Sequence, residues 1–153
     1  MATIHFTETT SATPEEFLAG LTDFGAGRSE LFGNSSAKYL KVHEKGATYA
    51  DVTEGSGGVW ERLRYDWSDP RHVVMTTTDS NIWGGHSGHT YTFTPQPDGT
   101  TKLQVDVVRE GKNLRGKATE ALVGSVGKGV LHKSLMNTIK AVEDRSHHPS
   151  SGT

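Results

Sequence analysis

The composition is that of a near-neutral chain without cysteine. The chain has 153 residues, 16 Lys and Arg against 18 Asp and Glu, a formal net charge of -2 and no Cys. This length is enough for one domain with a substantial core, whereas the balanced charge argues against a nucleic-acid-binding surface. The lack of Cys excludes disulfides, thiolate catalysis and Cys-ligated zinc or iron–sulfur sites.

The N-terminal segment MATIHFTETTSATPEEF has no basic region followed by an apolar run, so it predicts no signal peptide. No stretch approaches the ~18 consecutive apolar residues of a membrane-spanning helix. We therefore expect a cytoplasmic protein, and the absence of Cys suits a reducing compartment.

A strand and a short helix are predicted at the start of the chain. Residues 3–10 alternate weakly between apolar and polar and are rich in Thr, which favours a strand. The sequence TPEE at 13–16 is typical of a helix start, because Thr13 can cap, Pro14 suits the first helical position and Glu16 can complete a capping box. An amphipathic helix should follow to about Phe24, residues 28–32 can add a turn or two, and 33–36 should form a loop.

Six further strands are predicted between residues 37 and 110, each bounded by turn residues. The sequence GSGG at 55–58 and the pair Asp98-Gly99 favour tight turns, and Asp69-Pro70 ends a strand rich in aromatic residues. The predicted strands cover residues 37–44, 47–54, 59–67, 73–78, 86–94 and 101–110.

Residues 114–145 are predicted to form one long helix packed on this sheet. At about 100° per residue its apolar side chains form two stripes, and the stripes change phase near Gly124, Gly127 and Gly129. A Gly inside a helix costs roughly 1 kcal/mol relative to Ala, so we expect a bend or break there. The first stripe contains Leu114, Ala118, Leu122, Val126 and Val130, and the second contains Leu131, Leu135, Ile139 and Val142.

The order of strand, short helices, six strands and long helix predicts an α+β fold with an antiparallel sheet of six or seven strands. A sheet of this size that curls around one helix cannot be filled by the helix alone. Its concave face must be filled by large side chains or must leave a cavity.

The sequence resembles the START/Bet v 1-like superfamily (SRPBCC), and within it the bacterial polyketide cyclase/dehydrase-like family. The resemblance covers about residues 3–145 and is carried by the TPEEF opening, the segment WERLRYDWSDP, the hairpin PDGTTKL and the long C-terminal helix. It implies a helix-grip fold, in which a curved sheet wraps the last helix around a hydrophobic cavity. Residues 1–146 would form one ligand-binding domain and 147–153 a disordered tail.

Alternation along two neighbouring strands indicates which side chains would line such a cavity. The hairpin at Asp98-Gly99 places residues 86–94 beside 101–110, so their inward-facing residues should share one surface. Trp60 and Trp83 are further candidates. Each aromatic is also compatible with plain core packing, His89 with a structural hydrogen bond, and Arg109 with a carboxylate partner. The candidate ligand-binding residues are Trp60, Trp83, His89, Tyr91, Phe93, Val105, Val107 and Arg109.

No metal or cofactor site is predicted. His86 and His89 are three residues apart, so on one strand they point to opposite faces. The segment GSVGKG at 124–129 lacks the spacing, the preceding strand and the following Ser or Thr of a phosphate loop. The sequence GHSG at 85–88 is one residue short of a serine-nucleophile motif.

Two functions of different classes fit this sequence. The first is binding or transport of a hydrophobic small molecule, lipid-like or aromatic, by a monomer or homodimer. The second is a cyclase or dehydratase acting on a poly-β-keto chain, with His89, Asp79 or Arg109 as acid or base. A third function, stimulation of a chaperone, is disfavoured because no helix is predicted to expose an apolar face.

Overall fold

The computed structural model describes residues 1–33 and 35–147. The tail expected at 147–153 therefore lies outside the described residues, apart from His147 at the end of the last helix. The elements are β1 (Ala2–Thr10), α1 (Pro14–Leu21), α2 (Arg28–Leu31), β2 (Lys41–Lys45), β3 (Tyr49–Ser56), β4 (Val59–Asp69), β5 (His72–Ser80), β6 (Gly88–Pro95), β7 (Thr101–Arg109), α3 (Leu114–Leu122), η1 (Val123–Gly127) and α4 (Lys128–His147).

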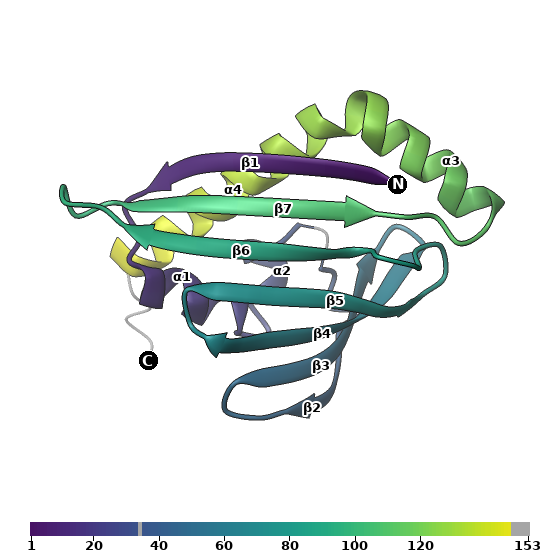
Figure 1. The fold of residues 1–153 in the computed structure, drawn as a ribbon. Helices are drawn as coiled ribbons and strands as arrows, with labels where there is room; N and C mark the ends of the chain where they lie inside the picture. The colour runs from purple at the N-terminus through teal and green to yellow at the C-terminus, as the bar shows by residue number, and fades with distance from the viewer. Residues whose placement is uncertain (34, 148–153) are drawn as a thin grey trace.

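The strands form one seven-stranded sheet in the order β1-β7-β6-β5-β4-β3-β2, and every neighbouring pair is antiparallel (Figure 1). One strand pair joins distant parts of the chain: β1 pairs with β7, with Ala2 opposite Arg109. The other neighbours in the sheet are consecutive strands, as a meander requires. The predicted α+β helix-grip fold is confirmed.

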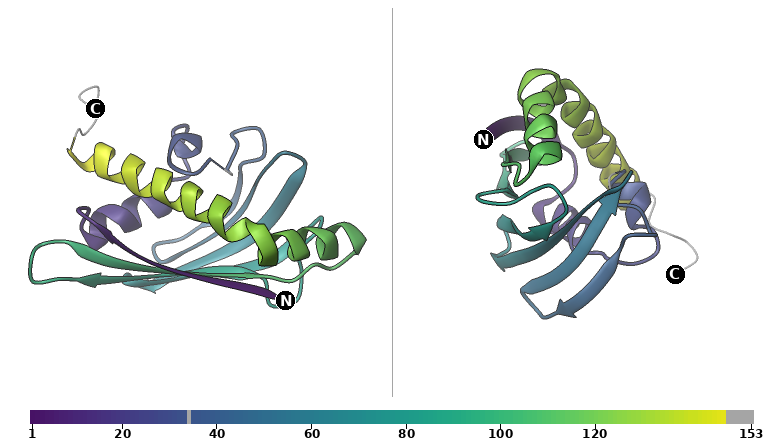
Figure 2. Two further views of the ribbon diagram at one scale, coloured as in Figure 1. Left: turned by 90° about the horizontal axis from the view of Figure 1, so that it is seen from above. Right: turned by 90° about the vertical axis from the view of Figure 1, so that its right-hand side faces the viewer.

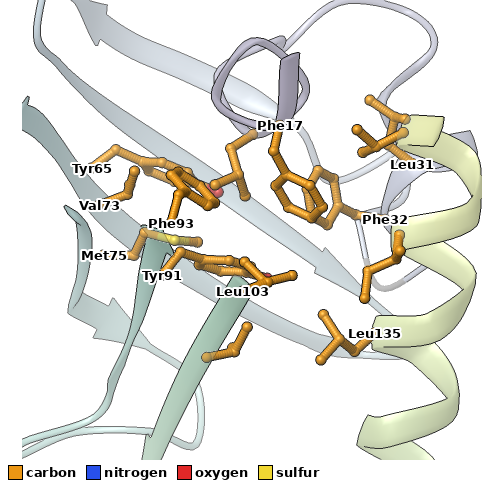
Figure 3. Close-up of a cluster of buried hydrophobic side chains, with 14 of the residues drawn as sticks. Phe17, Leu31, Phe32, Tyr65, Val73, Met75, Tyr91, Phe93, Leu103 and Leu135 are labelled. Atoms are coloured by element: carbon orange, nitrogen blue, oxygen red, sulfur yellow. The ribbon is translucent and has the colours of Figure 1, made fainter. Parts of the chain in front are cut away.

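The last helix crosses the concave face of the sheet (Figure 2). Its second apolar stripe packs inward, since Leu135, Ile139 and Val142 are buried and Leu131 is half-buried. Helix α1 closes one end of the same core. Thr13 and Glu16 form the predicted capping box, and Phe17 lies 5.5 Å from Phe93 between ring centroids (Figure 3).

The predicted break in the long helix is confirmed. Residues Val123–Gly127 form a π turn between α3 and α4, and the two α-helices run at an angle to each other (Figure 2). A π turn replaces the usual hydrogen bonds to the fourth residue back with bonds to the fifth, which shifts the phase of the helix face. The glycines at 124 and 127 make this departure from regular geometry easier.

The first apolar stripe of the helix does not pack on the sheet. Leu114, Leu122, Val126 and Val130 are 90%, 60%, 66% and 71% exposed. The expectation that no helix exposes an apolar face is therefore wrong. The physical reason is that this stripe faces away from the sheet, while α3 packs through Gly116, which is buried against the carbonyl of Ile82 in the connection between β5 and β6.

Two predicted strands begin later than expected. Residues 37–40 form a turn, because the backbone amides of Tyr39 and Leu40 both bond to the carbonyl of Ser36. Residues 86 and 87 belong to a tight loop, in which the Ser87 hydroxyl donates to the carbonyl of Gly84. Local side-chain and turn bonds of this kind compete with strand pairing.

Candidate ligand cavity

A cavity of about 360 Å³ lies between the concave face of the sheet and the last helix. Its floor is formed by β-strand residues and its roof by η1 and α4. Apolar side chains supply most of the surface, which is the usual character of a small-molecule pocket. They include Phe6, Phe32, Leu63, Met75, Val105, Val107, Val123, Leu131 and Leu135.

The structure brings seven of the eight candidate residues to this cavity. They are Trp60, Trp83, His89, Tyr91, Val105, Val107 and Arg109. Phe93 is the exception, because it lies further along β6, where α1 covers it and Phe17 packs on its ring (Figure 3). Asp79 is also away from the cavity, with a 60% exposed side chain facing Lys112.

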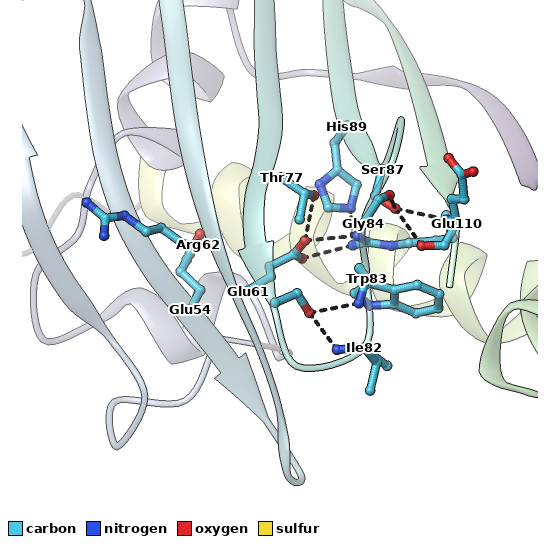
Figure 4. Close-up of polar contacts among 12 residues, drawn as sticks. Glu54, Glu61, Arg62, Thr77, Ile82, Trp83, Gly84, Ser87, His89 and Glu110 are labelled. Carbon is cyan, nitrogen blue, oxygen red and sulfur yellow. Dashed lines mark hydrogen bonds and ion pairs between the residues drawn. The ribbon is translucent and has the colours of Figure 1, made fainter. Parts of the chain in front are cut away.

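The polar end of the cavity is built around Arg109. Its two Nη atoms each donate to a carboxylate oxygen of Glu61 at 2.9 Å, and one of them also donates to His89 Nε2 at 2.8 Å. The guanidinium carbon lies 5.1 Å from the ring centroid of Trp83. Glu61 additionally accepts from the Thr77 hydroxyl at 2.9 Å (Figure 4). Arg109 is thus paired with a carboxylate, as one of the sequence alternatives allowed.

This arrangement determines the protonation of the cluster. Burial raises the pKa of Glu61, but the charge of Arg109 and the hydrogen bonds outweigh it, so the pKa is lowered. Burial, followed by repulsion from Arg109, lowers the pKa of His89 to about 4. His89 is therefore neutral at pH 7. Because Arg109 can only donate, His89 Nε2 must accept, and the ring proton is assigned to Nδ1.

His89 Nδ1 is the one buried side-chain nitrogen or oxygen without a hydrogen-bond partner among residues 1–33 and 35–147. Buried polar groups normally have partners, so an exception marks a site of strain or function.

A second polar cluster lies on the same cavity wall and was not predicted. Arg28 donates to Glu54, to the Tyr65 hydroxyl at 2.8 Å, and to the carbonyls of Leu21 and Asp23 at 3.0 and 2.7 Å. Tyr65 in turn donates to the other carboxylate oxygen of Glu54, and burial is the main reason why the pKa of Tyr65 is raised well above its usual value. Arg28 and Glu54 are 2% and 7% exposed.

The two clusters are neighbours, because Glu54 on β3 and Glu61 on β4 are directly paired across the strands. The sequence contains a signal for both. Glu54 continues the inward alternation of Ala50 and Val52, and Glu61 precedes the inward-facing Leu63. A carboxylate at an inward-facing position of a strand indicates that a buried cation or hydrogen-bond donor lies beside it.

Tyr91 provides a polar group that is not used inside the protein. Its side chain is 9% exposed and lines the cavity, and its hydroxyl, which is not fully enclosed by protein atoms, has no hydrogen-bond partner in the described part of the chain. Burial raises the pKa of Tyr91 to about 12, so the phenol keeps its proton at neutral pH. It can therefore donate a hydrogen bond to a molecule in the cavity.

The described residues contain no cluster of three or more His, Cys, Asp or Glu side chains that would hold a metal ion. Among the helices of residues 1–33 and 35–147, none is long and apolar enough to cross a bilayer.

A curved antiparallel sheet, a long helix across it and a mainly apolar cavity between them define the helix-grip, START-like class of proteins. The family described as "Polyketide cyclase / dehydrase and lipid transport" matches residues 1–143, and the chain belongs to this family. A search of curated proteins finds no match.

Solved structures share the fold at low sequence identity. A START superfamily protein from Mycobacterium smegmatis has a TM-score of 0.69 and 14% identity, covering 97% of this chain and 99% of that one. The Zhui aromatase/cyclase from Streptomyces sp. R1128 has a TM-score of 0.67 and 17% identity, covering 95% and 93%. A protein from Thermus thermophilus has a TM-score of 0.70 and 14% identity, covering 97% and 99%.

Proposed function

We propose that this protein binds or carries a compact hydrophobic small molecule, aromatic or lipid-like, in the cavity between the sheet and α4. The family supports a cavity protein of this kind. The observation that carries the proposal is the contrast between the apolar lining and polar groups of lining residues that are not used inside the protein. Among them are the Tyr91 hydroxyl and the buried Nδ1 of His89, neither of which has a hydrogen-bond partner within the described residues.

The charges of the wall favour a neutral ligand. Arg109 and Arg28 are each neutralised by a buried carboxylate. An anionic group would have to compete with Glu61 or Glu54 for these cations, at the cost of leaving a buried carboxylate unpaired. A carbonyl or hydroxyl group near Tyr91 meets no such competition. A volume of about 360 Å³ lies near the small end of ligand pockets, which suits a molecule of a few rings or one short chain.

The proposal is tested by titration with an environment-sensitive apolar dye. We expect saturable binding at one site per chain. Ser134→Phe should abolish it, because Ser134 lines the cavity from α4 and a phenyl ring there fills the space. Asn137→Phe, on the exposed side of the same helix, is the matched control and should bind normally.

The role of Tyr91 is tested with a ketone-bearing aromatic ligand. Tyr91→Phe keeps the ring and removes the hydroxyl, so affinity should fall roughly tenfold, the loss expected for one buried hydrogen bond. Equal binding by the wild type, Ser134→Phe and Tyr91→Phe would exclude this cavity as the site.

A second candidate function is catalysis of cyclisation or dehydration in the same cavity. The observation that favours it is the unpartnered Nδ1 of His89, a neutral imidazole fixed by Arg109. Such a group can donate to a carbonyl or enolate oxygen as charge develops there. If His89→Gln retains dye binding but loses turnover of a poly-β-keto substrate, the protein is an enzyme. If the wild type shows no turnover, the result supports the binding or carrier function.

A further inference from the structure

The exposed stripe of the long helix forms a surface of unusual composition. We call it the helix ridge and define it by four aliphatic residues, Leu114, Leu122, Val126 and Val130, and the basic residues around them, Arg115, Lys117, Lys128 and Lys133. The four aliphatic side chains are each at least 60% exposed. Exposed apolar side chains scattered singly are ordinary, but a row of them along one element marks an interaction surface.

The ridge carries a local excess of positive charge. Segment 112–133 contains five Lys and Arg residues and one carboxylate, whereas the whole chain has a net charge of -2. That carboxylate, Glu120, is already bound by the N-terminal amine at 2.6 Å and by the Gly111 amide at 2.8 Å. Arg115, Lys128 and Lys133 have no carboxylate within ion-pair distance in the described residues.

The ridge also adjoins one end of the cavity. Arg115 donates to the carbonyl of Gly58 at 3.3 Å, so its side of α3 faces the turn between β3 and β4. Leu122 follows Arg115 by seven residues, two turns of α-helix, so it lies on the same side of α3. Val126 in the π turn and Val130 in α4 continue the row of exposed aliphatic side chains. Val123, between them, lines the cavity, as do Ser56 and Val59 of the opposite turn.

We propose that the helix ridge docks this protein on an anionic lipid membrane surface. Aliphatic side chains flanked by Lys and Arg are the composition of helices that lie in the plane of a bilayer surface, with the apolar groups among the acyl chains and the cations at the headgroups. Anionic lipid attracts each basic residue near the surface. Docking in this way brings the end of the cavity lined by Val123 close to the membrane.

Two other occupants fit less well. A second copy related by two-fold symmetry would place ridge against ridge and bring like charges together. An acidic protein would match the charge, but the ridge lacks the aromatic side chains that usually anchor protein partners. The bilayer needs neither a pocket nor an anchor, because it accepts a convex row of aliphatic groups.

The test is co-sedimentation of the full chain with lipid vesicles, without any added ligand, so it is independent of the proposed cavity function. Vesicles of phosphatidylcholine are compared with vesicles containing about 30% phosphatidylglycerol. We expect binding to the anionic vesicles only, and we expect it to weaken strongly between about 0.05 and 0.5 M NaCl.

Two double variants separate the two parts of the ridge. Lys128→Gln/Lys133→Gln should lower the partition coefficient about fivefold for each charge removed. Leu122→Asn/Val126→Asn should lower it roughly tenfold or more by removing the inserted groups. All four side chains are exposed, so the fold should be retained.

Matched controls lie elsewhere on the surface. Lys41→Gln/Lys140→Gln removes the same charge, and Val42→Asn/Val74→Asn removes exposed apolar side chains from the sheet. Both should bind like the wild type. The proposal is overturned if neutral vesicles bind equally, if the ridge variants bind like the controls, or if no vesicle binds. In the last case, loss of a dimer in Leu122→Asn/Val126→Asn by native mass spectrometry would assign the ridge to a second copy of the chain.

Discussion

Two carboxylates face each other across β3 and β4, and they have different hydrogen-bond partners. Glu54 is held by Arg28, Ser35 and Tyr65 in a network whose Arg also bonds two backbone carbonyls of the α1 region. Glu61 is held by Arg109, which is shared with His89. Like charges directly opposite in a sheet are unfavourable, so each carboxylate needs its own cation.

The difference between the two clusters lies in what is left unpaired. Every polar atom of the Arg28–Glu54 cluster that is buried has a partner, whereas the Arg109–Glu61 cluster includes the orphan Nδ1 of His89. A satisfied network ties elements together. A network with a free donor beside a cavity can interact with a ligand. We therefore assign the first cluster to the fold and the second to the site.

The largest expected effect is on the cluster that we assign to the fold. Arg28→Ala removes the cation and leaves Glu54 buried without it, so the free energy of unfolding should fall by ~3–5 kcal/mol. Urea denaturation at pH 7 measures this loss. Arg62→Ala is the control, because Arg62 pairs with Asp51 at the surface with a 42% exposed side chain, and it should cost only ~0.2–1 kcal/mol.

If Arg28→Ala and Arg62→Ala destabilised the protein equally, the buried Arg28–Glu54 network would not stabilise the fold more than a surface ion pair does. If Arg28→Ala folded normally but no longer bound the apolar dye, the division of roles between the two clusters would be reversed.

The second effect is a pH dependence that arises from His89. Its pKa is about 4 in the folded protein against an ordinary value of 6.5 for imidazole. Between these values the unfolded chain binds the proton more readily, so stability is complete above pH 6.5 and is lost as the pH falls towards 4. The loss from this residue should reach about 3 kcal/mol, and below pH 4 it should not grow.

The measurement is urea denaturation across this range for the wild type and His89→Gln. The lowered pKa of Glu61 also removes stability in acid, but it is present in both proteins, so the difference between the curves reports His89. His72→Gln, on the exposed side of β5, is the control. Parallel curves for wild type and His89→Gln would show that His89 is not held neutral.

The smallest effect concerns the helix that closes the cavity over both carboxylates. Gly127 lies in the π turn with an ordinary negative φ, and a Cβ there would lie 3.4 Å from the Leu122 carbonyl oxygen and from Val123. Gly127→Ala should therefore stabilise the protein by less than ~1 kcal/mol. Gly129 meets open space, so Gly129→Ala should gain more. Thermal unfolding measures the stability of the two variants. A loss of stability in Gly127→Ala would show that the bend depends on Gly127.

Much of the fold follows from local patterns in the sequence. Local geometry is specified by a few neighbouring residues in each of four places. These are the alternation of His89 and Tyr91, the turn at Asp98-Gly99, the capping box at Thr13 and the glycine-rich break. The exposed first stripe of the helix was the main error. Periodicity shows which side chains share a face, but it does not show whether the sheet is long enough to cover them.

The amino-acid sequence by itself determined the order of elements, the faces of the strands and the place of the bend, because these depend on backbone preferences and on a period of two or 3.6 residues. Only the tertiary structure decided which cation meets which carboxylate. Arg109 on β7 reaches Glu61 on β4 although β6 and β5 lie between them. On a flat sheet three strand spacings of ~4.8 Å would keep their backbones ~14 Å apart. Curvature of the sheet and the length of the Arg side chain bring the charges together, and neither is encoded in any short stretch of sequence.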